Sequence, residues 1–165
     1  MKKVLISIFL LSCIFTCDLF IEAKELDYSD ASLEVLENII YLDNGDYIIK
    51  TIKEVNSNSS LQTRSIYTKT GELEVNHYNA SDKLLWTYTL VGIYQINEGI
   101  SCSCVSSSYS TEIFKSTWSF SDGDSSYANN YARGLGVFKC KILFVTAQTV
   151  DIDVTLYCDV YGNLS

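Results

Sequence analysis

Apolar and polar residues alternate near the carboxyl end of the chain, and this alternation limits the fold more than any other feature. Because neighbouring side chains of a strand point to opposite faces, a period of two predicts strands that bury one face. Lysines fill the polar positions of the first segment and aspartates those of the second, which favours antiparallel pairing. We expect the turn between these strands at 146–148. The alternating apolar residues are Phe138, Cys140, Ile142 and Phe144, then Val150, Ile152, Val154, Leu156, Cys158 and Val160.

Shorter alternating segments recur upstream and are separated by turns rich in Gly, Asn, Asp and Ser. The chain has no proline and only 19% charged residues, and it is rich in Ser, Thr, Tyr, Ile and Val. This composition favours strands over helices. The sequence therefore predicts an all-β fold, an antiparallel β-sandwich or open barrel of about seven to nine strands. Further strands are expected at 47–55, 61–69, 72–78, 84–96, 100–104, 114–120 and 127–133, with a turn at Thr70-Gly71 and a loop at 121–125.

The segment before these strands has a different pattern. Leu33, Leu36 and Ile40 recur at helical spacing, and Asp30 is positioned to cap a short helix. We therefore expect a short helical or irregular amino-terminal arm at 24–45, followed by a single β domain at 46–165.

The first residues have the pattern of a secretory signal peptide. Two lysines precede an apolar run from Val4 to Ile21, and the small residue Ala23 marks a cleavage position. We expect 1–23 to be removed on export, which makes the protein secreted or associated with the cell envelope. Two alternatives stay open. The run could remain as a membrane anchor, or Leu10-Leu11-Ser12-Cys13 could act as a lipobox that directs lipid to Cys13.

Net charge limits the partners. The formal net charge is −8, and loss of 1–23 leaves it unchanged because two lysines and two acids are removed together. Nucleic acids require a basic footprint, and anionic lipids attract basic segments. We therefore expect no nucleic-acid partner, and membrane contact only through an uncleaved or lipidated signal segment.

Four cysteines follow the signal segment, and an even number in an exported protein indicates disulfides. Four cysteines allow three pairings. Cys102 and Cys104 are not expected to pair with each other, because strand residues two apart diverge from disulfide geometry. All four alternate with polar residues, so buried free thiols are the alternative. The other two are Cys140 and Cys158.

The segment 83–92 reads Lys-Leu-Leu-Trp-Thr-Tyr-Thr-Leu-Val-Gly, and an aromatic-x-x-Asn turn follows at 94–97. Trp118 lies further on, and the chain closes with a Leu-x-Cys and a Gly-x-Leu-Ser segment. In these features 65–165 resembles a family of small, uncharacterised secreted proteins from Gram-positive bacteria, a domain of unknown function. The resemblance implies export and a β fold, and it implies no activity.

The resemblance also implies a disulfide between Cys104 and Cys158, since cysteines of the family fall at these positions and both are expected to face inward. Cys102 and Cys140, which depart from the family pattern, would then form a second pair. A bond between Cys102 and Cys158 is an open alternative, because Cys102 is expected to share a face with Cys104.

No catalytic motif stands out. His77 is the sole histidine and lacks obvious partners for metal or acid–base chemistry, so we expect a solvent-facing strand residue. Carboxylates that a hydrolase would need are present at Glu72, Glu74 and Glu112, but nothing in the sequence selects two of them. We therefore assign no catalytic, metal or cofactor-binding residue.

The twelve tyrosines are the one enrichment that hints at binding. Tyr109, Tyr127 and Tyr131 are expected on strands with polar neighbours, where exposed rings stack on sugars or anchor protein partners. Cross-strand aromatic pairing is the alternative. We expect a non-enzymatic interaction or adhesion module at or beyond the cell envelope, with an unknown protein or glycan as its partner. The alternatives are a glycan-binding module and a small secreted hydrolase with a carboxylate site.

Overall fold

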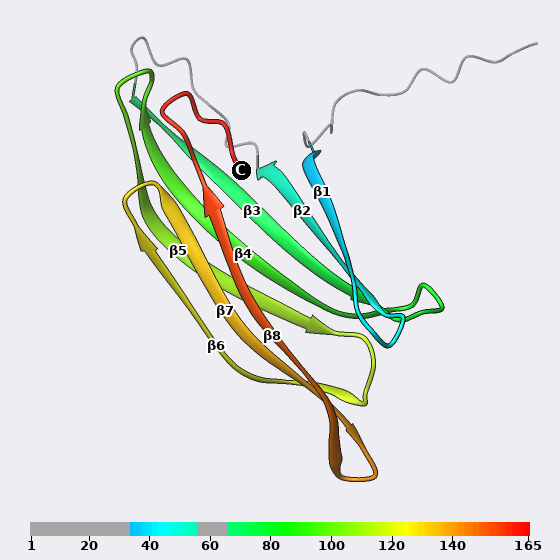
Figure 1. Ribbon diagram of the computed structural model, residues 1–165. Helices are drawn as coiled ribbons and strands as arrows, with labels where there is room; N and C mark the ends of the chain where they lie inside the picture. The colour runs from blue at the N-terminus through cyan, green and yellow to red at the C-terminus, as the bar shows by residue number, and fades with distance from the viewer. Residues whose placement is uncertain (1–33, 56–65) are drawn as a thin grey trace, which may run out of the picture. The chain divides into compact units, whose positions relative to one another are not determined.

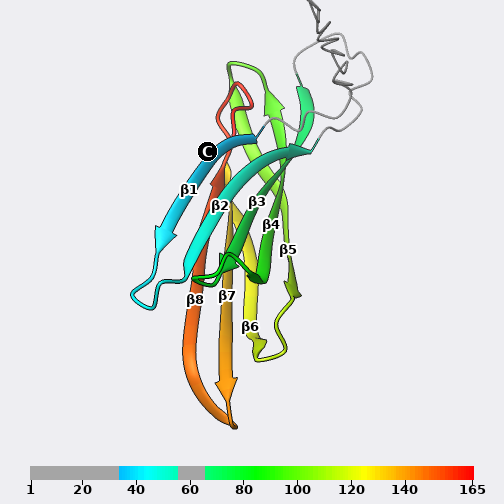
Figure 2. The same cartoon turned by 90° about the vertical axis from the view of Figure 1, so that its right-hand side faces the viewer.

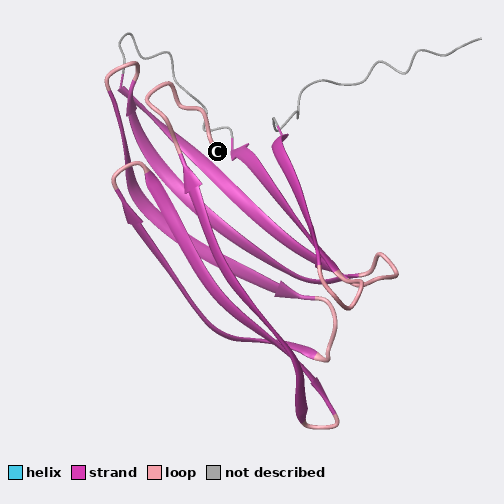
Figure 3. Cartoon of the chain, in the orientation of Figure 1, coloured by secondary structure: helices cyan, strands magenta, loops and turns pink. Residues whose placement is uncertain are grey.

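The computed structural model describes residues 34–55 and 66–165, which form two antiparallel sheets and contain no helix (Figures 1 and 3). Sheet A has the strand order β1 (Glu34–Tyr41), β2 (Tyr47–Val55), β3 (Ile66–Tyr78), β4 (Leu84–Asn97) and β5 (Ser101–Ile113). Sheet B has the order β6 (Trp118–Ala128), β7 (Tyr131–Ile142) and β8 (Val145–Tyr157). The prediction of an all-β, sandwich-like fold is confirmed. The predicted signal peptide at 1–23 lies outside the described residues.

Sheet B packs against the β3, β4 and β5 side of sheet A (Figure 2). The core lies between the sheets and consists of the inward-facing residues of the alternating segments. Along β4 these residues are fully buried, and the face they share is the one that the alternation predicts. Burying several large apolar side chains in this way is the main force that holds two sheets together. The core includes Leu73, Val75, Trp86, Tyr88, Leu90, Tyr94, Ile96, Ala132, Phe138, Ile152, Val154, Leu156 and Cys158.

The inner face of β7 carries two glycines because aromatic rings from β4 occupy the space where side chains would lie. A Cβ atom at Gly134 would lie 2.5 Å from the hydroxyl oxygen of Tyr88, and one at Gly136 would lie 3.0 Å from its ring. The same hydroxyl donates a hydrogen bond to the Leu135 carbonyl at 3.2 Å. The glycines therefore allow the close approach that brings a tyrosine across the interface between the sheets.

Two predicted turns lie inside strands. Gly71, expected in a turn, is part of the continuous strand β3 and faces Gly92 of β4. A Cβ atom at Gly71 would lie 2.7 Å from the side chain of Leu164, so close packing explains this glycine. The loop expected at 121–125 is part of β6, where a register shift after Phe120 marks a bulge. The glycine of the first segment thus allows close packing, and the residues of the second lie at a strand irregularity.

The predicted amino-terminal helix is wrong for the described part of the arm, while 24–33 lie outside the described residues. Residues Glu34–Tyr41 form β1, which pairs with β2 in a register that sets Ile40 opposite Ile48 and Tyr41 opposite Tyr47. The neighbouring strand satisfies the backbone hydrogen bonds of this segment, so tertiary pairing overrides the helical spacing. Strand structure therefore begins before the boundary expected at residue 46.

The turn between β7 and β8 lies earlier than predicted. It consists of Leu143 and Phe144 rather than 146–148, because Ile142 pairs with Val145 and the polar residues that follow continue as β8. Phe144, expected on an inward face, is fully exposed at 101%. The alternation stops predicting burial here because residues 141–147 are exposed on both faces of the hairpin, so that no other sheet covers them.

Replacing Gly134 with valine should destabilise the fold by about 1–3 kcal/mol, because the added side chain would collide with the buried Tyr88 ring. Urea unfolding followed by tryptophan fluorescence measures the difference. Ser126→Val is the matched control, since Ser126 pairs with Arg133 on the exposed face of β6. Equal free energies of unfolding for the two variants would contradict the role given to Gly134.

Candidate functional site

The structure separates the three tyrosines proposed as ligand contacts. Tyr109 is half-buried on β5, stacks on Tyr88 with ring centroids 5.6 Å apart, and donates a hydrogen bond to the Gly123 carbonyl at 3.2 Å. Its ring therefore packs against the core. Tyr127 is 52% exposed on β6, opposite Ala132. The contacts of Tyr109 therefore agree with the alternative interpretation, in which the tyrosines form aromatic pairs across neighbouring strands.

Tyr131 remains a candidate because it has an aromatic neighbour on an exposed face. It pairs with Tyr157 of β8, and the two rings lie 5.5 Å apart at 52°. Two residues along β7, Arg133 donates two hydrogen bonds to Asp153, at 2.9 and 2.6 Å. These bonds lower the pKa of the Asp153 carboxyl. Aromatic faces beside charged hydrogen-bonding groups are typical of sugar-binding surfaces.

All four cysteines in the described part of the chain are free thiols. Burial raises the pKa of Cys158, and a hydrogen bond with the thiol of Cys102 raises it further. These two cysteines also line one open cavity of about 420 Å³, together with Asn130 and Asp159. Cys104 is buried opposite Tyr94 on the neighbouring strand. The bond between Cys104 and Cys158 is absent here and stays a prediction, while the thiols in contact are those of the alternative pair.

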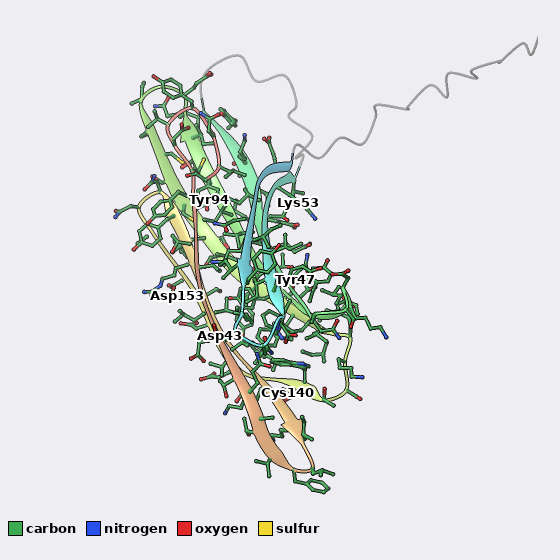
Figure 4. All side chains as sticks on the ribbon, turned by 45° about the vertical axis from the view of Figure 1, so that its right-hand side comes forward. Asp43, Tyr47, Lys53, Tyr94, Cys140 and Asp153 are labelled. Carbon is green, nitrogen blue, oxygen red and sulfur yellow. The ribbon has the colours of Figure 1, made fainter. Side chains whose placement is uncertain are left out.

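The second predicted pair, Cys102 with Cys140, does not fit this fold. The backbone N–H of Cys104 donates to the carbonyl of Asn129 in the turn between β6 and β7, at 2.6 Å, which places the start of β5 at that turn. Cys140 lies nine residues beyond Tyr131 along β7, which corresponds to about 30 Å. A disulfide requires Cα atoms within about 7 Å. Figure 4 shows Cys140 far from Tyr94, the residue that pairs with Cys104.

The carboxylates considered for a hydrolase lie on sheet A. Glu72 and Glu74 alternate with the buried residues of β3, so they belong to its outer face. Glu74 accepts hydrogen bonds from Lys53 at 3.4 Å and from Asn76. Glu112 is exposed on β5, and β4 separates it from β3. The contacts of Glu74 are those of a cross-strand ion pair on a sheet surface.

His77 is fully buried, which corrects the expectation of a solvent-facing residue. Its ring makes edge contacts with Trp86 and Trp118, with centroids 4.9 and 5.1 Å apart. Nε2 lies 3.4 Å from a carboxylate oxygen of Asp46, yet neither ring nitrogen has a well-formed hydrogen bond among the described residues. The alternation of Leu73, Val75 and His77 contained this information, because it places the histidine on the inward face.

A surface that the sequence reasoning missed lies at the turn between β7 and β8. Ile142, Leu143, Phe144 and Val145 are exposed by 57%, 87%, 101% and 68%, and we call these four residues the apolar tip. Single exposed apolar residues are common on protein surfaces, but a consecutive group with large aliphatic and aromatic members is not. In Figure 1 the tip projects beyond the ends of the neighbouring strands.

The packing of β7 explains why the tip is uncovered. Phe138 stacks on Trp86 with ring centroids 3.8 Å apart, and Trp86 lies two residues from the start of β4 at Leu84. The strand β7 continues from Phe138 to Ile142 before the turn. Sheet A has therefore ended at the level where the tip begins, and no residue of β4 remains to cover it.

The backbone of the tip has an uncommon conformation. Leu143 and Phe144 have φ values of +49° and +70°, and both are central residues of a two-residue hairpin turn. Positive φ at both positions is the requirement of a type I′ turn, for which Asn-Gly is the preferred sequence. Large side chains in this region carry a conformational cost. The sequence did contain a signal, the run of apolar residues 142–145. The alternating pattern led us to assign these residues to a strand instead of a turn.

The described residues contain no helix long and apolar enough to cross a bilayer. Within the same ranges, no group of three or more His, Cys, Asp or Glu side chains is arranged to hold a metal ion. No family model, curated protein or solved structure matches the chain. The apolar tip is therefore the feature on which a functional proposal rests.

Stability should fall as the pH drops from about 7.5 to about 5.5, because His77 is buried in its neutral form. Burial lowers the pKa of His77, while Asp46 partly opposes this shift. The unfolded chain takes up a proton near pH 6.5, whereas the folded chain does not. The contribution of neutral His77 to the free energy of unfolding is thus fully present above that pH, and it is lost as the pH falls towards the pKa of His77 in the folded protein.

Urea unfolding across this pH range measures the effect. The variant His77→Phe removes the titrating group and keeps an aromatic ring between the tryptophans, so it should show a smaller pH dependence than the wild type. Equal pH dependence in the two proteins would show that other groups cause the loss.

Proposed function

We propose that this chain is an exported, non-enzymatic interaction module that adheres at the cell envelope, and that the apolar tip is its contact surface. The observation that carries the proposal is the exposure of Leu143 and Phe144 at a hairpin turn. Exposed apolar groups that contribute nothing to the core are typical of surfaces that are covered by a partner.

The backbone of the tip supports the same proposal. Each bulky residue at positive φ costs on the order of 1 kcal/mol. Burial among the described residues does not offset this cost, because the two side chains are exposed. A sequence under selection for stability alone would place Asn-Gly here. The pair Leu143-Phe144 is therefore better explained by contacts made outside the chain.

A glycan-binding module is the second candidate, and the contact of Tyr131 with Tyr157 favours it. Tyr157 is 46% exposed, and the ion pair of Arg133 with Asp153 offers hydrogen-bonding groups close by on the same strands. Binding to a glycan array that is lost in Tyr157→Ala and retained in tip variants would favour this candidate over the first.

Export would also bring the cysteines into an oxidising environment. We expect one disulfide that involves Cys158, with Cys104 as the partner implied by the family resemblance and Cys102 as the partner that its thiol contacts. Either bond would tie the start of β5 to the segment after β8, closing a loop of about 55 residues and stabilising the fold by on the order of 4 kcal/mol.

Adhesion through the tip is tested by adding purified secreted protein to washed producing cells and sedimenting them. The wild type should sediment with the cells, and Leu143→Asn/Phe144→Gly should stay in the supernatant. Ile100→Asn is the matched control, because Ile100 is 73% exposed in the turn between β4 and β5. Wild type that does not sediment, or a tip variant that sediments equally well, would refute the proposal.

The disulfide is tested by alkylating the secreted, denatured protein without reduction and mapping its peptides. Cys140 should be alkylated, because it lies far from the other three cysteines. Cys158 should be protected together with either Cys102 or Cys104. Alkylation of all four thiols would show that no disulfide forms.

A further inference from the structure

We infer that the partner of the apolar tip is the surface of an anionic lipid bilayer, into which Leu143 and Phe144 insert. This inference rests on the proposed function, since it names the partner of the same surface. It departs from the expectation drawn from the net charge of −8, because it rests on the charges close to the tip rather than on those of the chain as a whole.

The backbone of the tip is suited to a low-polarity environment. Backbone groups that lose water in a bilayer must be hydrogen-bonded within the protein. Ile142 pairs with Val145 and Lys141 with Thr146, so the ladder between β7 and β8 reaches the turn, with one bulge at Ala147. Only the two turn residues lie beyond the ladder. Their side chains can therefore enter the interface while few backbone groups lose hydrogen bonds.

The charges of the β7–β8 hairpin beside the tip are positive. From Phe138 to Val150 the chain has no acidic residue, and its two charged residues are Lys139 and Lys141. Lys141 donates its backbone N–H to the carbonyl of Thr117 at 2.8 Å, which brings the exposed Lys115 of the connection between β5 and β6 to the same end. We call Lys115, Lys139 and Lys141 the lysine collar.

Acidic groups lie both behind the collar and beside it. Asp151 pairs with Val137, further from the turn than either lysine of β7. The connection between β1 and β2, which carries Asp43 and Asp46, lies level with the collar, because Asn44 contacts Gln148 at 3.4 Å and Gln148 pairs with Cys140. Lys141 pairs with Thr146 and is the charged residue of the hairpin nearest to the apolar tip, and anionic lipid headgroups attract basic side chains next to an inserting apolar surface.

A bilayer fits this surface better than a protein does. Protein interfaces combine apolar contacts with hydrogen bonds from a polar rim, and their anchor residues enter preformed pockets. The tip is convex and exposes the four apolar side chains of one turn together. A fluid apolar medium can surround such a tip without a matching pocket, and the lysine collar supplies the attraction at its border.

The test measures binding to vesicles of phosphatidylcholine, with and without about 30 mol% phosphatidylglycerol, by sedimentation at low and at high salt. The wild type should bind the anionic vesicles and release at high salt. Lys139→Gln/Lys141→Gln should bind them several-fold more weakly, because the collar is reduced. Ile100→Asn should bind as the wild type does, since that residue lies at the opposite end of the strands.

Leu143→Asn/Phe144→Gly should lower the partition coefficient by at least about tenfold. The same variant should unfold at an equal or higher temperature than the wild type, because Asn-Gly suits the type I′ turn. Loss of binding in a protein that is no less stable cannot be attributed to misfolding. Phe144→Trp provides a direct readout, since its emission should shift to shorter wavelength when anionic vesicles are added.

The outcomes separate this inference from the proposed function. Absence of vesicle binding, with tip-dependent sedimentation on cells, would overturn the lipid partner and indicate a protein partner of the same tip. Equal binding to neutral and anionic vesicles would overturn the role of the lysine collar. Absence of binding to both cells and vesicles would refute the proposed function as well.

Discussion

The packing of β4 aromatic residues against sheet B is the interaction on which the rest of the structure depends. Trp86 stacks on Phe138, the hydroxyl of Tyr88 reaches the Leu135 carbonyl across two glycines, and Tyr94 donates to the Leu156 carbonyl at 2.6 Å. These contacts occur at intervals along one strand, so they fix both the distance and the longitudinal position of the two sheets. Burial of the inner face of sheet B against β4 is therefore the main contribution that stabilises the three-stranded sheet.

The position of the apolar tip follows from this packing. The stack of Phe138 on Trp86 sets β7 so that its last residues extend past the beginning of β4. Trp118 of β6 pairs with Cys140 and is the last residue of its strand in this direction. Beyond Cys140, no described strand of sheet A lies opposite β7. The exposure of the tip is therefore a consequence of strand register. A register that buried the tip against sheet A would also have to break the stack of Phe138 on Trp86.

The alternation of apolar residues predicts which face of a strand turns inward, and along β4 and β8 this was sufficient. It does not reveal whether another sheet covers that face. Phe144 follows the same period as Phe138 and is nonetheless fully exposed, because sheet A ends before the tip begins. His77 shows the opposite error. It lies in the same alternation as Val75 and is buried, but it was expected to face solvent because histidine is polar. The strand β1 was missed because its pairing with β2 is not visible in the local spacing.

Two separate costs coincide at the same two residues of the turn. Leu143 and Phe144 expose large apolar side chains to water, and they also occupy the left-handed region that Asn and Gly tolerate better. Elsewhere the described turns follow the rules of turn chemistry, as in the positive φ values of Asp82, Asn129 and Gly45. The chain follows these local rules at the other described turns and breaks them at one exposed turn. This contrast indicates that the turn was selected for something other than stability. Neither cost is relieved by contacts among the described residues, and this is the reason for proposing that a partner covers the turn.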